Sequence, residues 1–233
     1  MSEQPERDAA NWASKVERLH VTEDLRRHGY NVEGRRVAGP QQGFGRLWQR
    51  TSMARLGEAV TPEALVADWR ANFGSYWPST AHFHGGIGGI QPGDVTPLTA
   101  GPMTTGILVL YADETSFTFL TPEGHMFAGM ITFSASIVDG GTCARIDILL
   151  RMADPLVEAA WPVVHPAEDR FWAGTLRNLA AAHGVSRVRV EQTTTLVDGR
   201  RLWRNWGNVF HNAAIHSAWH AVSTPVRERR RPR

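Results

Sequence analysis

Six segments of the chain show the alternation of apolar and polar residues, rich in β-branched and aromatic side chains, that is typical of β-strands. They are residues 44–56, 107–111, 116–120, 126–138, 142–151 and 187–197. Turn signals join the four central segments, and Asp139-Gly140-Gly141 is a hairpin sequence that requires positive φ angles. Short strands joined by tight turns predict an antiparallel meander.

Apolar residues at helical spacing predict three amphipathic helices. They cover residues 62–73, 166–183 and about 201–221. Asp154 begins a shorter helical segment, and Pro162 is expected to break it because proline lacks the backbone donor of a helix interior. The order of elements, with consecutive strands between helices, predicts an α+β fold rather than a doubly wound sheet.

Composition divides the chain into three parts. Residues 1–40 are polar and are expected to form a loosely ordered N-terminal extension. Residues 41–226 are expected to form a single domain, and residues 227–233 form a basic tail. The Gly-, Pro- and Trp-rich stretch that begins at residue 74 predicts a long covering loop with little regular structure, of which residues 74–93 would act as a lid.

The overall composition indicates a folded, cytoplasmic protein. The chain has 233 residues, of which 42% are hydrophobic, and it contains nine tryptophans. The longest apolar run, about residues 107–112, is too short to cross a membrane. The single cysteine, Cys143, cannot form an internal disulfide, and three acidic residues among the first ten argue against a secretory leader.

The net charge of +2 conceals a basic C-terminal region. Residues 200–233 hold eight arginines and one glutamate. Because most of these arginines lie in the tail rather than along a face of the domain, they indicate a solvated terminus and not a phosphate-binding arm. The sequence therefore predicts no nucleic-acid partner and no membrane partner.

Two stretches of the chain resemble the START-like, or SRPBCC, superfamily. They are SFTFLTPEGHMFAG at residues 116–129 and EDRFW at residues 168–172, and the order of elements over residues 44–184 is similar. The resemblance is to a branch without an assigned activity. It implies a helix-grip fold, in which a curved antiparallel sheet grips a long helix, with an apolar cavity between them. The N-terminal extension and the strand and helix after residue 184 are additions to that pattern.

The leading hypothesis for function is the binding of an apolar or amphipathic small molecule, lipid-like or polyketide-like, between the sheet and helix 166–183. Ligand pockets are mostly apolar with few polar groups, and the sequence places many aromatic side chains on these two elements. The residues expected to bind the ligand are Tyr111, Phe119, Met130, Phe133, Trp172 and Leu176.

Two alternatives use the same fold. In the first, a cyclase- or dehydratase-type enzyme uses His125 with Glu123 as an acid/base pair, because a histidine tuned by a carboxylate can transfer protons near neutral pH. In the second, the chain is a structural module whose cavity is filled by its own side chains. A homodimer through helix 201–221 is compatible with each of these functions.

Three further motifs favour ordinary structural roles. The run HGGIGG at residues 84–89 lacks the spacing of a dinucleotide loop and is expected to belong to the lid. His216 and His220 share a helix face but lack the glutamate of a zinc-protease helix, so neither a metal nor a cofactor is expected. Arg145, Asp147 and Arg151 alternate along one strand and predict a solvated row of ion pairs.

Overall fold

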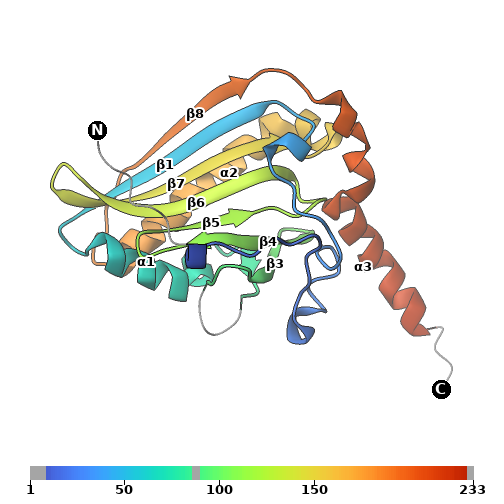
Figure 1. The fold of residues 1–233 in the computed structure, drawn as a ribbon, viewed down its shortest axis with the longest axis horizontal. Coiled ribbons are helices and arrows are strands. Elements are labelled where there is room, and N and C mark those ends of the chain that lie inside the picture. Colours follow the sequence, from blue (N-terminus) through green and yellow to red (C-terminus); the bar gives the residue numbers. More distant parts are fainter. Residues whose placement is uncertain (1–8, 86–89, 230–233) are drawn as a thin grey trace.

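The computed structural model describes residues 9–85 and 90–229 (Figure 1). The strands are β1 Leu47–Gly57, β2 Ala81–Phe83, β3 Val95–Ala100, β4 Met103–Ala112, β5 Ser116–Leu120, β6 Phe127–Val138, β7 Gly141–Met152 and β8 Val190–Asp198. The helices are α1 Pro62–Ala71, α2 Pro155–Ala182 and α3 Ala213–Arg229, and the longest 3-10 helix is η5 Trp203–His211.

The eight strands form one antiparallel sheet in the order β2-β3-β4-β5-β6-β7-β1-β8. Strands β4 to β7 follow one another as the predicted meander, and β1 closes against β7 with Leu47 opposite Arg151. The turn between β6 and β7 has the expected positive φ angles, 52° at Asp139 and 83° at Gly140. The sheet curves strongly, and α2 runs across its inner face (Figure 1). The predicted α+β helix-grip fold is therefore confirmed.

Helices α1 and α2 cover the inner face together and share one hydrophobic core. From α1, Trp69 is fully buried and meets the rings of Phe117 and Phe133 edge-on. From α2, Leu176 and Leu179 are fully buried in the same cluster. The helices thus divide the inner face, so that α1 fills the end near the β6–β7 hairpin while α2 crosses the rest (Figure 1).

Helix α2 is continuous where the sequence predicts a break and a new start. It runs from Pro155 to Ala182 through Pro162 and Pro166. Both internal prolines are exposed, so they interrupt the hydrogen bonding on the solvent side of the helix, where the missing bonds cost less than in the core. Asp154 caps the start through Leu156 and Val157, as expected from the Asp-Pro pair.

The stretch after residue 74 contains more regular structure than predicted. Strands β2 and β3 pair there, and β4 begins four residues earlier than the expected strand. The segment that precedes β1 also packs on the sheet, since Leu19, Val21 and Val32 form a small buried cluster with Leu108 of β4. The sequence predicts a loosely ordered extension here because residues 1–40 are mostly polar, and its few buried apolar residues are spaced far apart.

The predicted helix over residues 201–221 is two elements. The 3-10 helix η5 ends at His211, and Asn212 then caps α3 by accepting a hydrogen bond from the Ala214 N–H at 2.9 Å. Asn212 also donates to the buried carboxylate of Asp154 at 2.7 Å. The hydrogen bond between Asn212 and Asp154 connects the start of α3 to the start of α2. The chain changes direction at Asn212, between η5 and α3.

Of the predicted row of exposed ion pairs on β7, the structure contains one pair. Arg145 and Asp147 form an exposed pair on β7. Arg151, on the same face, is 2% exposed and donates to Asp198 and to the carbonyl groups of Gly45 and Arg200. Arg151 is buried because the end of β8 and the chain before β1 fold over the end of β7.

Candidate functional site

A cavity of about 380 Å³ lies between the sheet and α2. Its walls come from β2–β7, from the β5–β6 connection, and from one face of α2. The lining residues are Phe73, Trp77, Thr80, Ala81, Phe83, Leu98, Ala100, Gly101, Met103, Ile107, Phe119, Thr121, His125, Met126, Phe127, Gly129, Met130, Ile131, Ile148, Leu150, Val164, Ala167, Glu168, Phe171 and Trp172. Among these described residues, His125 and Glu168 are the only ionisable side chains.

The cavity opens to solvent between α2 and the β2–β4 region. Thr80, Gly101 and Ala167 line it and are themselves exposed, whereas Phe119 and Leu150 in its interior are buried. The exposed residues therefore mark the mouth. Of the segment expected to form a lid, Trp77 and Phe83 lie in the cavity wall, and residues 86–89 lie outside the part of the chain that the structure describes.

His125 lies in the cavity wall just before β6. The backbone nitrogen of Phe127 lies 3.0 Å from its Nδ1. The Phe127 carbonyl oxygen lies 3.2 Å from the same Nδ1, so the two contacts fit either neutral tautomer, and Nε2 is the nitrogen left for a ligand. Burial lowers the pKa of His125 to about 4. At neutral pH this residue therefore contributes a neutral ring.

The lowered pKa of His125 predicts a loss of stability in acid. The unfolded chain takes up the proton near pH 6.5 and the folded chain only near pH 4, so the free energy of unfolding falls as pH drops through this interval. We expect His125 to account for about 2 kcal/mol of the fall between pH 7 and pH 4.5. Urea denaturation at the two pH values should show a correspondingly smaller fall for His125→Gln, and equal falls in variant and parent would contradict this.

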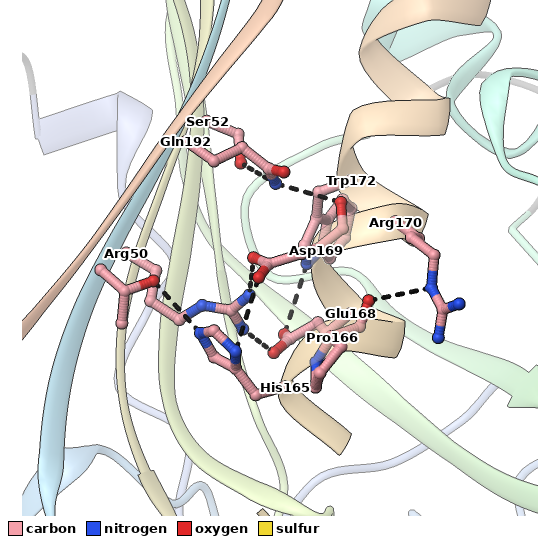
Figure 2. A network of polar contacts seen from close by, with 10 residues as sticks. Arg50, Ser52, His165, Pro166, Glu168, Asp169, Arg170, Trp172 and Gln192 are labelled. Carbon is pink, nitrogen blue, oxygen red and sulfur yellow. Dashed lines mark hydrogen bonds and ion pairs between the residues drawn. The ribbon is translucent and has the colours of Figure 1, made fainter. Parts of the chain in front are cut away.

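A buried charge cluster borders the cavity on the α2 side. The guanidinium of Arg50, from β1, lies between the carboxylates of Glu168 and Asp169 on α2 and pairs with both (Figure 2). Arg50 is 4% exposed. Trp172 Nε1 donates to the other oxygen of Glu168 at 3.3 Å. Glu168 is thereby held at the cavity surface by one charged and one neutral donor.

The electrostatics of Glu168 combine two opposing effects. Burial raises the pKa of its carboxyl, and the adjacent Arg50 guanidinium and Trp172 N–H act against that rise. The ring of Trp161 lies 5.6 Å from the Arg50 guanidinium carbon, in cation–π range. His165 stands beside the same pair, and burial together with the Arg50 charge lowers its pKa.

The structure brings three of the six predicted ligand-binding residues to the cavity surface. Phe119, Met130 and Trp172 line it. Phe133 and Leu176 are fully buried in the core cluster that also contains Trp69 of α1, and they are not among the lining residues. The sequence pattern could place these two side chains on the inner face but could not show that α1 fills that end of it.

Tyr111 and Glu123 lie away from the cavity lining. Tyr111 packs against Trp12 of the N-terminal segment at a ring distance of 4.7 Å and donates to the carboxylate of Asp113. The Glu123 carboxylate lies 3.7 Å from Nε2 of His211 in η5, while the described contacts of the His125 ring nitrogens go to Phe127. The expected acid/base pair remains a hypothesis without a contact between its members.

The β5–β6 connection joins the cavity wall to the C-terminal elements. Thr121, His125 and Met126 face the cavity. Behind them, Gly124 has a φ of 91°, its carbonyl accepts a hydrogen bond from the Ala213 N–H at 2.8 Å, and a Cβ at this position would lie 2.2 Å from the His211 carbonyl oxygen. Only glycine fits this close approach.

The Arg50–Glu168 pair is the feature that sequence reasoning missed. Glu168 occurs in the EDRFW stretch that carried the family resemblance, but its partner is 118 residues away on β1. The only signal in the sequence is the alternation along β1. Arg50 lies on the same side of this strand as Trp48 and Ala54, which face the core. An inward arginine requires a buried carboxylate, and an acidic pair on the covering helix supplies it.

No protein-family model matches the sequence, and a comparison with curated proteins gives no significant match. Solved structures share part of the fold. The di-domain ARO/CYC StfQ from the steffimycin biosynthetic pathway is 11% identical, with a TM-score of 0.42 over 58% of this chain and 50% of its own. A Thermobifida fusca protein is 18% identical, with a TM-score of 0.43 over 60% of this chain and 95% of its own.

A further match is the ginseng major latex-like protein 151 from Panax ginseng, 16% identical, with a TM-score of 0.39 over 60% of this chain and 99% of its own. At these identities the comparison concerns the arrangement of the chain and not its activity. The chain spans half the length of StfQ, the first of these structures. The helix-grip arrangement itself is seen directly in the sheet and α2 (Figure 1).

Proposed function

We propose that this protein binds an apolar or amphipathic small molecule in the cavity between its sheet and α2. The observation that carries the proposal is the cavity itself, about 380 Å³ of space lined almost entirely by aromatic and aliphatic side chains. Small-molecule sites typically have volumes of about 300 to 1,000 Å³ and such a lining. The open mouth at Thr80, Gly101 and Ala167 provides a route of entry.

The polar groups in the wall restrict which molecules fit. The neutral imidazole of His125 offers one hydrogen-bonding nitrogen, Nε2, and Glu168 offers a carboxylate already held by Arg50. These two groups suit a ligand with an apolar body and one or two uncharged polar ends. A ligand that buries about 300 Å² of apolar surface gains several kcal/mol before the costs of association, enough for affinities on the order of 10 µM.

A substitution at the mouth tests the proposal. Titration of the protein with fatty acids, sterols and aromatic polyketides should give a saturable change in tryptophan emission, because Trp77 and Trp172 line the cavity. Ala167→Phe places a ring in the mouth and should weaken that binding about tenfold or more. Ala181→Phe makes the same change at an exposed position of α2 outside the cavity lining and should leave binding unchanged. Absence of saturable binding, or equal binding by both variants, would contradict the proposal.

The geometry favours binding over proton transfer. A general base works best with a pKa near the working pH, and burial lowers the pKa of His125 to about 4. Glu123, the expected partner of His125, faces His211 instead. The predicted pair of His125 and Glu123 therefore gives little support to the cyclase or dehydratase alternative, and His125 is better suited to orient a ligand by a hydrogen bond.

The alternative of a filled cavity has less support than ligand binding. Trp69 and the phenylalanine rings around it fill the inner face under α1. Trp77 and Trp172 stand at the cavity wall, 6.5 Å apart between ring centres, and the space between the sheet and α2 stays open.

A further inference from the structure

The C-terminal segment presents large apolar side chains to solvent. In η5, Trp203, Trp206 and Phe210 are 54 to 70% exposed. In α3, Ile215, Trp219 and Val222 are 49 to 72% exposed. Single exposed apolar residues are ordinary, but six on two successive elements indicate a site of interaction. We call these six residues the C-terminal apolar surface.

Helix α3 is amphipathic, but its apolar side faces outward. Its buried side carries small and polar residues: Ala213 is buried, and Ser217 is hydrogen-bonded to Asn31 and to the Thr104 N–H on β4. Ile215, Trp219 and Val222 follow at intervals of four and three residues, which places them on one stripe. They occupy the opposite side of the helix from Ser217, and α3 projects from the end of the sheet (Figure 1).

Basic residues flank the C-terminal apolar surface. Arg204 lies within η5 and is exposed, and Arg200 and Arg201 precede it. Arg200 pairs with Asp198 and Arg201 with Glu158, which offset part of this charge. Five more arginines and one glutamate follow between residues 227 and 233, so residues 200–233 carry a net charge of +7.

The charge identifies the kind of partner. A symmetric dimer through this surface would bring the same arginine-rich segment of two chains together, and like charges in an interface are unfavourable. Trp203 and Trp206 of η5 face outward beside the exposed Arg204, and Trp219 of α3 faces outward as well. Outward tryptophans next to an arginine match the interfacial layer of an anionic membrane.

We propose that η5 and the outward side of α3 dock on the surface of an anionic lipid bilayer. Trp203, Trp206 and Trp219 enter the interfacial layer, where the amphipathic indole ring is favoured. Arg200, Arg201 and Arg204 lie near the lipid phosphates, and each contributes roughly a several-fold gain in affinity. The contact lies along the surface: no helix among the described residues is long and apolar enough to span a bilayer.

Vesicle co-sedimentation of the full chain tests this docking without any cavity ligand. The protein should sediment with vesicles of phosphatidylcholine and phosphatidylserine, should bind pure phosphatidylcholine vesicles at least tenfold more weakly, and should be released by salt. Trp206→Ser/Trp219→Ser should lower the partition coefficient at least tenfold. Arg204→Glu should lower it about tenfold, because it changes the charge by two units.

Matched substitutions elsewhere serve as controls. Ile137→Ser/Val163→Ser removes two exposed apolar side chains outside the C-terminal surface, and Arg177→Glu reverses an exposed charge on α2. Both should bind vesicles like the parent, and all variants should keep the parent melting temperature. Equal binding by surface variants and controls would overturn the proposal. So would absence of binding to anionic vesicles, or a dimer in sedimentation velocity that the Trp206→Ser/Trp219→Ser change dissociates.

Discussion

Replacing Arg50 with methionine is expected to lower the free energy of unfolding by about 3 kcal/mol. Arg50 is 4% exposed and neutralises both Glu168 and Asp169. Methionine fills a similar volume but leaves the Glu168 carboxylate, whose side chain is 12% exposed, without its counter-charge. Urea denaturation at pH 7 should show a lower midpoint with an unchanged slope.

Two further variants distinguish the cost of leaving the Glu168 carboxylate uncompensated from the cost of losing the Arg50 side chain. Arg50→Met/Glu168→Gln removes the uncompensated carboxylate, keeps an acceptor for Trp172, and should recover at least half of the loss. Arg145→Met breaks the exposed pair with Asp147 and should cost less than about 1 kcal/mol. If Arg50→Met costs no more than Arg145→Met, the buried pair is not a stabilising feature of the site.

Trp69→Ala is expected to cost about 4 kcal/mol, the largest loss among single aromatic truncations in this core. The indole is fully buried and lies 5.3 to 5.9 Å, between ring centres, from Phe117 and Phe133. Its removal opens a space between α1 and β6 that the rigid aromatic rings cannot close. Thermal and urea denaturation should both show the loss, and enlargement of the space under α1 should increase binding of an apolar dye.

Two comparisons isolate the packing contribution. Trp69→Phe keeps one ring and removes an indole N–H that has no partner among the described residues, so it should cost less than about 1.5 kcal/mol. Trp219→Ala removes an indole that is 72% exposed and should change stability by less than about 0.5 kcal/mol. A cost for Trp69→Ala as small as that for Trp219→Ala would mean that α1 is not part of the core.

The alternation of apolar and polar residues was sufficient to predict the bounds of the central strands. β5 has the predicted bounds, and β6 and β7 agree within one residue, because two-residue alternation and a turn that needs positive φ are local signals. The short strands β2 and β3 were missed. Each depends on pairing with a neighbour more than on its own composition, and Pro97 within β3 argues against a strand unless its neighbours are known.

The sequence predicts that an apolar cavity lies between the sheet and α2, but it does not predict which polar residues line or border that cavity. Phe119, Met130 and Trp172 follow from alternation on the strands and from helical spacing on α2. The contact between Arg50 and Glu168 joins segments 118 residues apart, and one sequence contains no local pattern that links them. Long-range pairings of this kind determine which inner residues face empty space and which face another side chain.

The junction at Gly124 makes the C-terminal segment an outer support of the cavity wall. One backbone carbonyl, on the turn that also carries His125, receives the first N–H of α3, and His211 leaves no room for a side chain between them. A chain shortened before His211 would expose that carbonyl and release the outer support of the wall. We therefore expect the elements after β8, which lie beyond the minimal sheet-and-helix arrangement, to help keep the cavity in shape.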